Sequence, residues 1–427
     1  MKVLVVGGGG REHAVIRKLK EDNADLEIIC APGNGGISAD AEIVPVAATD
    51  VEGMVSLAKE RRVDYVIVTP DDPLALGMVD AMKSAGFAAF GPTKAAARIE
   101  ASKVFSKNLM KKYGIPTAGF EVFTSPETAL AYVRERNQYP TVIKADGLAL
   151  GKGVIIAQNE EEAKSALRHL MVDKAFGESG SRVVIEDFMT GVEVSVLSFA
   201  DGTAIVPMVS SMDHKRVNDN DEGLNTGGMG TIAPSPFYTE EAARRCMEEI
   251  FLPTMAAMKA EGCPFAGCLY FGLILTENGP KVIEYNSRFG DPETQVVLPL
   301  LDGNLLEIMR ACSDGCLRED MVKWKDGAAA CVIEASGGYP EHYEKGKKIE
   351  GLREDGQADG VTVFHSGTKK IAGVYYTNGG RVLGITATAP TLKEALEKAY
   401  AGVEKITFEG MHARSDIGAK ALKGVAA

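Results

Sequence analysis

The chain has 427 residues, which at roughly 150 residues per domain predicts about three domains, each with a core of its own. Charged residues make up 25% of the sequence and hydrophobic residues 45%, so the composition argues against a disordered or fibrous chain. The net charge of -12 would repel a polyanion, and no apolar run approaches the roughly 18 residues needed to cross a bilayer. We therefore expect a cytoplasmic protein that binds neither nucleic acid nor a membrane.

The first hundred residues alternate short β-branched runs with helical patterns. Strands are expected at 2–6, 27–30, 65–68 and 87–90, with helices at 11–21, 51–61, 73–85 and 94–113. Strands that alternate with helices in this way form a parallel sheet wrapped by helices. We place the end of this first domain at residue 104.

The rest of the chain has a mixed pattern, and the fold class predicted for the whole is α/β and α+β multidomain. Residues 117–191 read as a small α+β lid, and residues 192–327 as a central domain. The central domain contains a helix at 240–259 and strands at 269–276 and 281–286. Residues 328–427 form the last domain, with strands at 329–334, 361–365 and 381–389 and a helix at 392–404.

A glycine-rich loop follows the first strand and opens the first helix. Its sequence is Gly7-Gly-Gly9-Gly10-Arg11-Glu12, so backbone amides and the helix dipole favour a phosphate or carboxylate there. The dinucleotide fingerprint fails because its third glycine would stand at Glu12, and because the second strand ends without an acid for a ribose. Arg11 suits a phosphomonoester, and a tight turn without a ligand is the alternative.

A second glycine-rich loop runs from Lys144 to Gly153 between two strands. It is not a Walker A loop, since only three residues separate Gly147 from Gly151, and Gly153 rather than Ser or Thr follows Lys152. The two lysines could supply fixed and closing positive charge over a triphosphate. A solvated hairpin with two surface lysines is the alternative.

Two acids stand near the end of the lid. Glu186 ends an apolar strand, where it could accept from an exocyclic amine, and Glu193 follows a turn, where it could bind ribose hydroxyls. Taken singly, each also fits an ordinary surface acid.

The segment from Val282 to Glu293 is the strongest local constellation. Strand alternation predicts that Glu284 and Asn286 share one face while Ile283 and Tyr285 enter the core. Two neighbouring hard oxygen ligands favour magnesium. A solvated polar edge is the alternative, but the charged residues that follow add groups able to hold an anion and a cation: Arg288, Asp291 and Glu293.

One long loop carries Asp213-His-Lys215-Arg216 and then Asn225-Thr-Gly-Gly-Met-Gly230. Its first part is cationic and its second part is rich in backbone amides, and both suit an anionic substrate. An acid–base role for His214 stays open, because a lone histidine is weak evidence for one.

Taken together with Gly91-Pro-Thr-Lys94 and Arg414-x-Asp-Ile-Gly418, these motifs resemble the glycinamide ribonucleotide synthetase (phosphoribosylamine–glycine ligase) family of the ATP-grasp superfamily from end to end. The Asp-His-Lys-Arg, Asn-Thr-Gly-Gly-Met-Gly and Arg-Phe-Gly-Asp-Pro-Glu strings are specific to this family. The resemblance implies an N-terminal parallel-sheet (pre-ATP-grasp) domain over 1–104, an ATP-grasp region over 105–327 and a C-terminal mixed domain over 328–427.

The resemblance also implies a reaction. ATP would drive ligation of glycine to 5-phosphoribosylamine, giving glycinamide ribonucleotide, ADP and phosphate through glycyl phosphate, in de novo purine biosynthesis. The partners would be these small molecules, the co-substrate ATP and Mg²⁺ or Mn²⁺, and the enzyme would be a monomer.

Residue roles follow from the resemblance in the same way. ATP would contact Lys103, Lys144, Gly147, Gly151, Lys152, Gly153, Glu186, Phe188 and Glu193. The metal would be held by Glu284 and Asn286, and the groups acting on the reacting atoms would be Lys144, Lys152 and Arg288. The substrates would meet Gly9, Gly10, Arg11, Glu12, Asn34, Pro70, Asp71, Asp213, Lys215, Thr226, Gly227, Gly228, Arg288 and Asp291.

The chain departs from the family pattern at two points. Thr69-Pro70-Asp71 replaces the usual Gly-Pro-Glu, which shortens an acid expected near the sugar. The strand before Glu284 carries Tyr270, Gly272 and Ile274 where many ATP-grasp relatives have a third metal carboxylate. The competing interpretations are a nicotinamide oxidoreductase, a nucleotide-gated regulatory module and an ATP-grasp ligase for another carboxylate.

Overall fold

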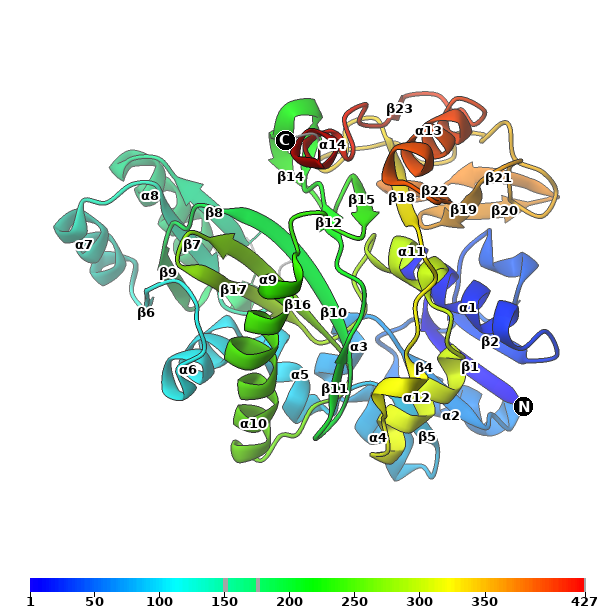
Figure 1. Cartoon of the computed structure of the whole chain (residues 1–427), viewed down its shortest axis with the longest axis horizontal. Helices are drawn as coiled ribbons and strands as arrows, with labels where there is room; N and C mark the ends of the chain where they lie inside the picture. Colours follow the sequence, from blue (N-terminus) through cyan, green and yellow to red (C-terminus); the bar gives the residue numbers. More distant parts are fainter. Residues whose placement is uncertain (149–152, 174–176, 426–427) are drawn as a thin grey trace.

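A computed structural model describes residues 1–148, 153–173 and 177–425 (Figure 1). Its N-terminal unit is built on a five-stranded, all-parallel sheet in the order β3-β2-β1-β4-β5. The strands are β1 (Lys2–Gly7), β2 (Glu27–Pro32), β3 (Glu42–Ile43), β4 (Tyr65–Val68) and β5 (Ala88–Phe90). The predicted parallel sheet is confirmed.

The helices of this unit are more divided than the sequence pattern predicts. They are α1 (Gly10–Asp22), α2 (Val51–Arg61), α3 (Asp71–Leu76), α4 (Met78–Ser84), α5 (Lys94–Ala101) and α6 (Lys103–Tyr113). Gly77, at φ +93°, separates α3 from α4. The expected helix over 94–113 is wrong as one element, because Ser102 leaves the helical conformation and its side chain caps α6 through the Phe105 amide.

The lid is a four-stranded antiparallel sheet in the order β6-β9-β7-β8 with two helices. Its elements are β6 (Phe120–Phe123), α7 (Pro126–Arg136), β7 (Thr141–Ala145), β8 (Val154–Ala157), α8 (Glu160–Leu167) and β9 (Val183–Asp187). It projects to one side of the molecule in Figure 1. The apolar cluster between its sheet and its helices draws only on residues 123–185.

The central sheet has the order β11-β10-β16-β17. Its strands are β10 (Val192–Asp201), β11 (Ile205–Pro207), β16 (Ala266–Thr276) and β17 (Gly279–Asn286), and one face packs on α9 (Glu240–Cys246) and α10 (Leu252–Ala260). A π-helical turn, η5 (Met247–Phe251), joins the two helices ahead of Pro253, which lacks an N–H for the regular ladder.

A β-bulge on β17 changes the alternation that the sequence predicts. Gly272 pairs with Glu284 while the next residue, Leu273, pairs with Val282, so Ile283 is the extra residue. Val282 and Tyr285 enter the core, and Ile283 does not. The expectation that Ile283 is buried is therefore wrong, although Glu284 and Asn286 still lie on the side opposite the core.

The last sheet combines strands from two parts of the chain. Its main path is β12-β15-β18-β22-β19, and β23 pairs with β18. Strands β12 (Met212–Asp213) and β15 (Gly230–Ala233) come from the long loop, and the others are β18 (Ala328–Ser336), β19 (Thr362–His365), β22 (Arg381–Ala389) and β23 (Met411–His412). The loop that carries the Asp-His-Lys-Arg motif is thus anchored in the C-terminal sheet.

Two hairpins and four helices complete the described chain. They are the hairpins β13 (Arg216–Asn218) with β14 (Glu222–Asn225) and β20 (Thr368–Ile371) with β21 (Val374–Thr377), and the helices α11 (Thr294–Val297), α12 (Leu305–Asp314), α13 (Leu392–Val403) and α14 (Ala419–Val425). Helix α12 packs on the N-terminal and central sheets. Within the described ranges, no helix has the length and apolar character needed to span a membrane.

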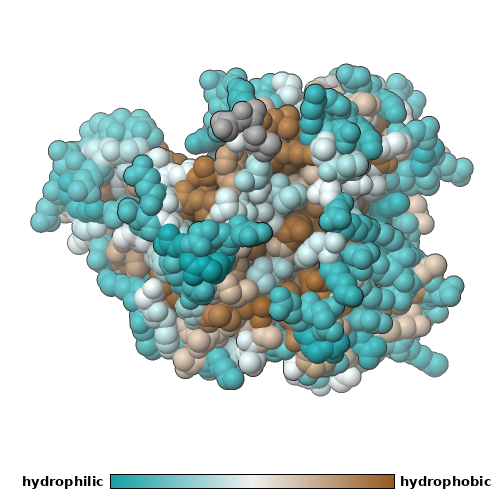
Figure 2. Space-filling model, in the orientation of Figure 1, coloured by the Kyte–Doolittle hydropathy of each residue, from teal (hydrophilic) through white to brown (hydrophobic). Residues whose placement is uncertain are grey.

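One apolar cluster joins three of the four units. It contains residues of the N-terminal sheet such as Val5, residues of the central sheet such as Phe199, and residues of the C-terminal sheet such as Cys331. Figure 2 shows a hydrophilic outline, apolar residues gathered toward the middle of this face, and an indentation between the lid and the C-terminal end. The lid therefore stands apart from a body that shares one core.

Candidate active site

A buried charge cluster lies where the lid sheet faces the central domain. Glu186 at the end of β9 is 2% exposed, and its two carboxylate oxygens lie 3.0 Å from Lys144 Nζ and 2.9 Å from Lys107 Nζ. Lys144 also donates to the Ile283 carbonyl at 3.2 Å, which ties the lid to β17. Burial lowers the pKa of Lys107 to about 8, although the Glu186 carboxylate raises it. Lys107 was not predicted from the sequence.

The base of the lid loop is fixed from α6. Lys103 Nζ donates to the Gly147 carbonyl at 2.8 Å, and Asp146 Oδ1 accepts from the Ser102 hydroxyl and the Val104 amide. Gly147 has φ +109°, and a Cβ there would stand 2.5 Å from Ser179 Oγ, so the turn requires glycine. The Gly153 carbonyl accepts from Ala145 N at 2.8 Å.

Two of the predicted ATP residues, Gly151 and Lys152, lie outside the described residues. The last two of these residues, Phe188 and Glu193, lie where the chain passes from the lid to the central sheet. Phe188 follows β9 with 43% of its surface exposed, and Glu193 on β10 is exposed as well. Glu193 Oε2 forms an ion pair with Lys215 Nζ at 3.3 Å.

The predicted metal ligands lie beside this cluster. Glu284 pairs with Gly272 and Asn286 with Tyr270, so the neighbouring strand adds no carboxylate to the pair. Burial would raise the pKa of Glu284, but the ammonium groups of Lys215, Lys144 and Lys103 outweigh it and lower the pKa. Among the described residues no group of three or more His, Cys, Asp or Glu side chains could hold a metal ion. A cation bound here would need oxygens from a substrate.

Arg288 connects β17 to the N-terminal unit. Its Nη2 lies 3.1 Å from Glu100 Oε1 and 3.3 Å from Asn286 Oδ1, while its buried Nε has no hydrogen-bond partner in the structure. Glu100 also accepts from the backbone and the hydroxyl of Ser287, each at 2.8 Å. Arg288 is thus held rigidly, with one buried donor left for an anion. The sequence did not indicate Glu100.

Asp71 begins α3 close to this arginine. Burial would raise the pKa of Asp71, but Arg288 and then Arg11 lower it. Pro70 precedes it and packs over Gly7, where its Cγ would stand 2.9 Å from an added Cβ. The shortened acid of this chain therefore still lies between the two arginines.

The glycine loop of the N-terminal unit is stabilised from within by Glu12. Its carboxylate accepts from the Gly9 amide at 2.5 Å, from Arg11 Nε at 2.6 Å and from the Thr69 hydroxyl at 2.7 Å. A Cβ on Gly10 would stand 2.6 Å from both Gln295 Nε2 and Ser366 Oγ. The residue that breaks the dinucleotide fingerprint is thus the one that shapes this loop.

Asn34 has a similar supporting position. Its Nδ2 donates to the Gly8 and His365 carbonyls at 2.9 and 2.7 Å, and its Oδ1 accepts from the amides of Gly36 and Ile37. These bonds use its side chain inside the protein, so direct contact of Asn34 with substrate stays a prediction.

Asp291 lies where three units meet. Its Oδ2 accepts from Arg11 N at 3.4 Å, and its Oδ1 accepts from Gln295 Nε2 at 2.8 Å and lies 3.4 Å from Arg381 Nη1. Burial would raise the pKa of Asp291, but Arg381 and Arg11 lower it. Arg381, at the start of β22, was not predicted from the sequence.

The amide-rich part of the long loop is hydrogen-bonded inside the protein. The amides of Thr226, Gly227, Gly228 and Met229 donate to Lys215 O, Tyr339 OH, Thr226 Oγ1 and His214 O, respectively. Arg381 Nη1 donates to the Gly227 carbonyl at 2.7 Å. The loop uses these donors to fold on itself and on the C-terminal unit, so direct contact of this loop with an anionic substrate stays a prediction.

Asp213 lies under this loop. Gly228 has φ +113°, and a Cβ there would stand 2.6 Å from Asp213 Oδ1 and 2.5 Å from Pro292 Cδ. Burial raises the pKa of Asp213 well above its usual range, and the neighbouring Glu293 raises it further. The cationic groups of Lys215 and Arg381 oppose this shift, so Asp213 already faces two positive charges of the protein.

The sequence matches the phosphoribosylglycinamide synthetase family in three parts, the N domain at residues 1–100, the ATP-grasp (A) domain at 101–294 and the C domain at 329–420. A phosphoribosylamine–glycine ligase of Caldanaerobacter subterraneus subsp. tengcongensis is 47% identical over 419 residues, covering 98% of this chain and 100% of the relative. One of Vibrio vulnificus is 47% identical over 425 residues, covering 99% of each chain.

Solved structures give the same result. The crystal structure of phosphoribosylamine–glycine ligase from Thermotoga maritima has a TM-score of 0.86 at 35% identity and covers 98% of this chain and 100% of its own. The biotin carboxylase domain of the Hydrogenobacter thermophilus 2-oxoglutarate carboxylase has a TM-score of 0.73 at 19% identity, which shows a shared fold alone. The chain belongs to the phosphoribosylamine–glycine ligase family and is an ATP-grasp ligase.

Proposed function

We propose that this chain joins glycine to 5-phosphoribosylamine at the expense of ATP, forming glycinamide ribonucleotide, ADP and phosphate. The observation that carries the proposal is the buried, unpartnered Nε of Arg288, set between the Glu284–Asn286 pair and the N-terminal glycine loop. A buried donor without a partner costs free energy unless a ligand accepts from it. A carboxylate bound there would lie between the nucleotide side and the sugar side of the site.

The lid and the central sheet would hold ATP. Lys103 and Lys144 support positions for phosphate oxygens, and Glu186 with the backbone of Phe188 would receive the base. Glu193 would contact the ribose, with Gly147 to Gly153, including Gly151 and Lys152, closing over the phosphates. Lys107 would orient the Glu186 carboxylate through their ion pair.

ATP-grasp ligases use ATP with a divalent metal ion, and we propose Mg²⁺ or Mn²⁺ here. The donor set of Glu284 and Asn286 fits a hard cation, since both offer oxygen. When held by Glu284 and Asn286, the cation would supply positive charge that offsets the negative charge of the phosphates. Because the pair contains only one carboxylate, the affinity of the site for the cation should depend strongly on bound ATP.

The two substrates would bind on either side of Arg288. Glycine's carboxylate would accept from Arg288, and its ammonium would face Asp213, where Lys215 and the turn at Thr226 to Gly228 close the pocket. Phosphoribosylamine would lie against Gly9 to Glu12, with Arg11 near its phosphate. Asn34 supports that loop, while Pro70-Asp71 and Asp291 border it.

The chemistry then needs no side-chain nucleophile. A carboxylate oxygen of glycine attacks the γ-phosphorus, the bond to the β-bridging oxygen breaks, and ADP leaves. The amine of phosphoribosylamine then attacks the acyl carbon of glycyl phosphate, phosphate leaves with the bonding electrons, and the nitrogen loses a proton. Lys144, Lys152 and Arg288 stabilise the transferred charge, and positioning supplies most of the rate.

The test is ADP release with each substrate omitted in turn. We expect release to require glycine and phosphoribosylamine together, and alanine to replace glycine poorly because its methyl group would need space beside Gly228. Arg288→Lys keeps the charge but loses the Nε donor and should raise the KM for glycine, whereas the exposed Arg318→Lys should not. Rapid ADP release with alanine would reject the substrate assignment.

We also propose that the enzyme acts as a monomer. Gel filtration with light scattering at assay concentration tests this, and a dimer that dissociates with loss of activity would contradict it.

A further inference from the structure

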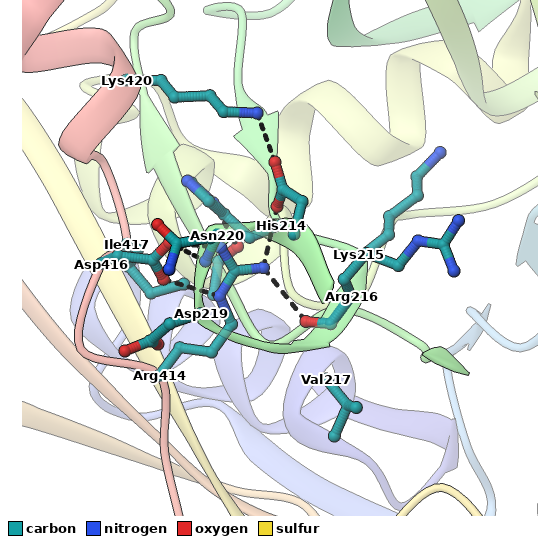
Figure 3. A network of polar contacts seen from close by, with 12 residues as sticks. His214, Lys215, Arg216, Val217, Asp219, Asn220, Arg414, Asp416, Ile417 and Lys420 are labelled. Atoms are coloured by element: carbon teal, nitrogen blue, oxygen red, sulfur yellow. Dashed lines mark hydrogen bonds and ion pairs between the residues drawn. The ribbon is translucent and has the colours of Figure 1, made fainter. Parts of the chain in front are cut away.

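A short segment near the C-terminus is bonded to the loop that carries Asp213 and Lys215. We call residues 412–420 the C-terminal clasp, and it lies against the β13–β14 hairpin (Figure 3). Its central residue is Arg414, whose side chain is 1% exposed. A buried guanidinium is costly unless its donors are satisfied, so its partners show what this residue holds.

Arg414 binds both the clasp and the hairpin. Its Nε and Nη2 donate to the two carboxylate oxygens of Asp416, each at 2.8 Å, which fixes the plane of the guanidinium. Its Nη1 then donates to the Arg216 carbonyl and to Asp221 Oδ1, each at 3.0 Å. One side chain therefore contacts the first strand of the hairpin and the turn that follows it.

The neighbours of Arg414 add contacts along the same hairpin. Asp416 Oδ2 accepts from the Asn220 amide at 2.8 Å, and His412 Nε2 lies 2.7 Å from the Val217 carbonyl. Asp219 accepts from the backbone and the hydroxyl of Ser415, and Asp221 accepts from Lys420. The hairpin has little apolar surface of its own, so these polar contacts hold it in place against the clasp.

His214 makes a second contact with the clasp, on the other side of Lys215. Its Nε2 accepts from the Gly418 amide at 3.1 Å, and its Nδ1 lies 3.1 Å from the Gly230 carbonyl. This pattern needs a neutral ring with the proton on Nδ1. His214 therefore supports the loop, which accounts for this residue without any acid–base role.

The contacts at His214 and Arg216 lie on either side of Lys215. Gly418 holds the ring of His214 and Arg414 holds the carbonyl of Arg216, so Lys215 between them has a defined position. Its side chain points away from the clasp in Figure 3 and reaches Glu193 at 3.3 Å and Glu284 at 4.0 Å.

We propose that the C-terminal clasp positions Asp213 and Lys215 for substrate handling, and that Arg414 is a positioning residue for the ligation. The proposal rests on the function proposed above, which assigns these two residues to glycine. Arg414 touches neither substrate. Its effect is transmitted through the Arg216 carbonyl, Asp221 and the backbone of the loop.

The test uses the full-length enzyme and the variant Arg414→Lys. Lysine keeps the charge, but its single nitrogen cannot bind Asp416 in a bidentate manner and reach the Arg216 carbonyl as well. The matched control is Arg353→Lys, because Arg353 binds Asp355 through Nε and Nη2 and Asp359 through Nη1 on the exposed surface of the same unit.

Two measurements are made on each protein, namely hydrogen exchange of the peptide covering 214–226 and steady-state kinetics with glycine and ATP varied separately. For Arg414→Lys we expect faster exchange, a kcat/KM for glycine lower by roughly tenfold to a hundredfold, and a KM for ATP within about twofold of wild type. Asp416→Asn should do the same, and the double variant should be less than additive because both residues act through one contact.

Asp219→Ala is a second variant if Arg414→Lys does not fold, since this half-buried residue contacts Ser415 and Asp416 of the clasp and leaves Arg414 in place. It should also lower the kcat/KM for glycine while leaving the KM for ATP nearly unchanged, but by a smaller factor. Faster exchange with unchanged glycine kinetics would overturn the proposal, as would equal changes in the ATP and glycine constants. ADP release by the wild type that does not need glycine would instead reject the proposed function, and with it the roles given to Asp213 and Lys215.

Discussion

Glu334 on β18 should make the stability of this protein fall as pH rises. Its side chain is fully buried, and neither carboxylate oxygen has a hydrogen-bond partner in the structure. Burial raises the pKa of Glu334 well above its usual range. The folded protein therefore keeps a proton that the unfolded chain releases above about pH 4.3, the ordinary value for glutamate.

The pH dependence of the free energy of unfolding follows from the difference in proton binding between the folded and unfolded states. Because the folded state binds the extra proton, the stability contributed by Glu334 is complete below the unfolded pKa and is lost as pH rises toward the folded pKa. The loss is up to about 1.4 kcal/mol for each pH unit, so a change from pH 5.5 to 7.5 removes up to about 2.7 kcal/mol. Glu334→Gln has nearly the same shape and cannot ionise, so it should escape this loss.

The assay is scanning calorimetry of wild type and Glu334→Gln at several pH values between 5.5 and 7.5. We expect the melting temperature of the variant, relative to wild type, to rise with pH by several degrees. The exposed Glu277→Gln is the control and should show a difference that does not depend on pH. A constant difference for Glu334→Gln, or one that falls with pH, would refute the reasoning.

Three further predictions concern the site. Glu284→Gln should keep the fold but lower ligase turnover by roughly a hundredfold, and activity within a fewfold of wild type at saturating magnesium would contradict its role. Gly228→Ala should raise the KM for glycine because its Cβ would meet Asp213 and Pro292, whereas Gly262→Ala, with no atom within 4 Å, should leave that constant unchanged. Lys107→Met should raise the KM for ATP more than that for glycine, because Glu186 loses one of its two cations. Equal changes in both constants would argue against that role.

The sequence pattern predicted the parallel sheet because four of its five strands, and the helical segments between them, carry their own local signal, whereas the two-residue β3 carries none. The bulge at Ile283 had no such signal, since an extra residue in a strand changes the alternation without changing the composition. The break at Ser102 could have been found, because serine before a helical run is a common N-cap.

The candidate site was predicted only where its residues stand in short motifs. Glu100 and Arg381 are far along the chain from Arg288 and Asp291, and nothing in their neighbourhoods marks them as partners. The partners of Gly227 also lacked a signal in the sequence, because Tyr339, which accepts from its amide, and Arg381, which donates to its carbonyl, come from the C-terminal unit. Contacts between units depend on tertiary packing, which local patterns do not record.

The separate apolar cluster of the lid has a consequence for how this protein loses its structure. Because that cluster draws only on residues 123–185, the lid can lose its own packing without opening the apolar clusters of the body. What it must break is polar, namely contacts such as those of Lys144 with the Ile283 carbonyl and of Glu186 with Lys107. The other three units share an apolar cluster in addition to clusters of their own, so a substitution at Val5, Phe199 or Cys331 should destabilise all three. We therefore expect the lid to unfold at a lower free energy than the body.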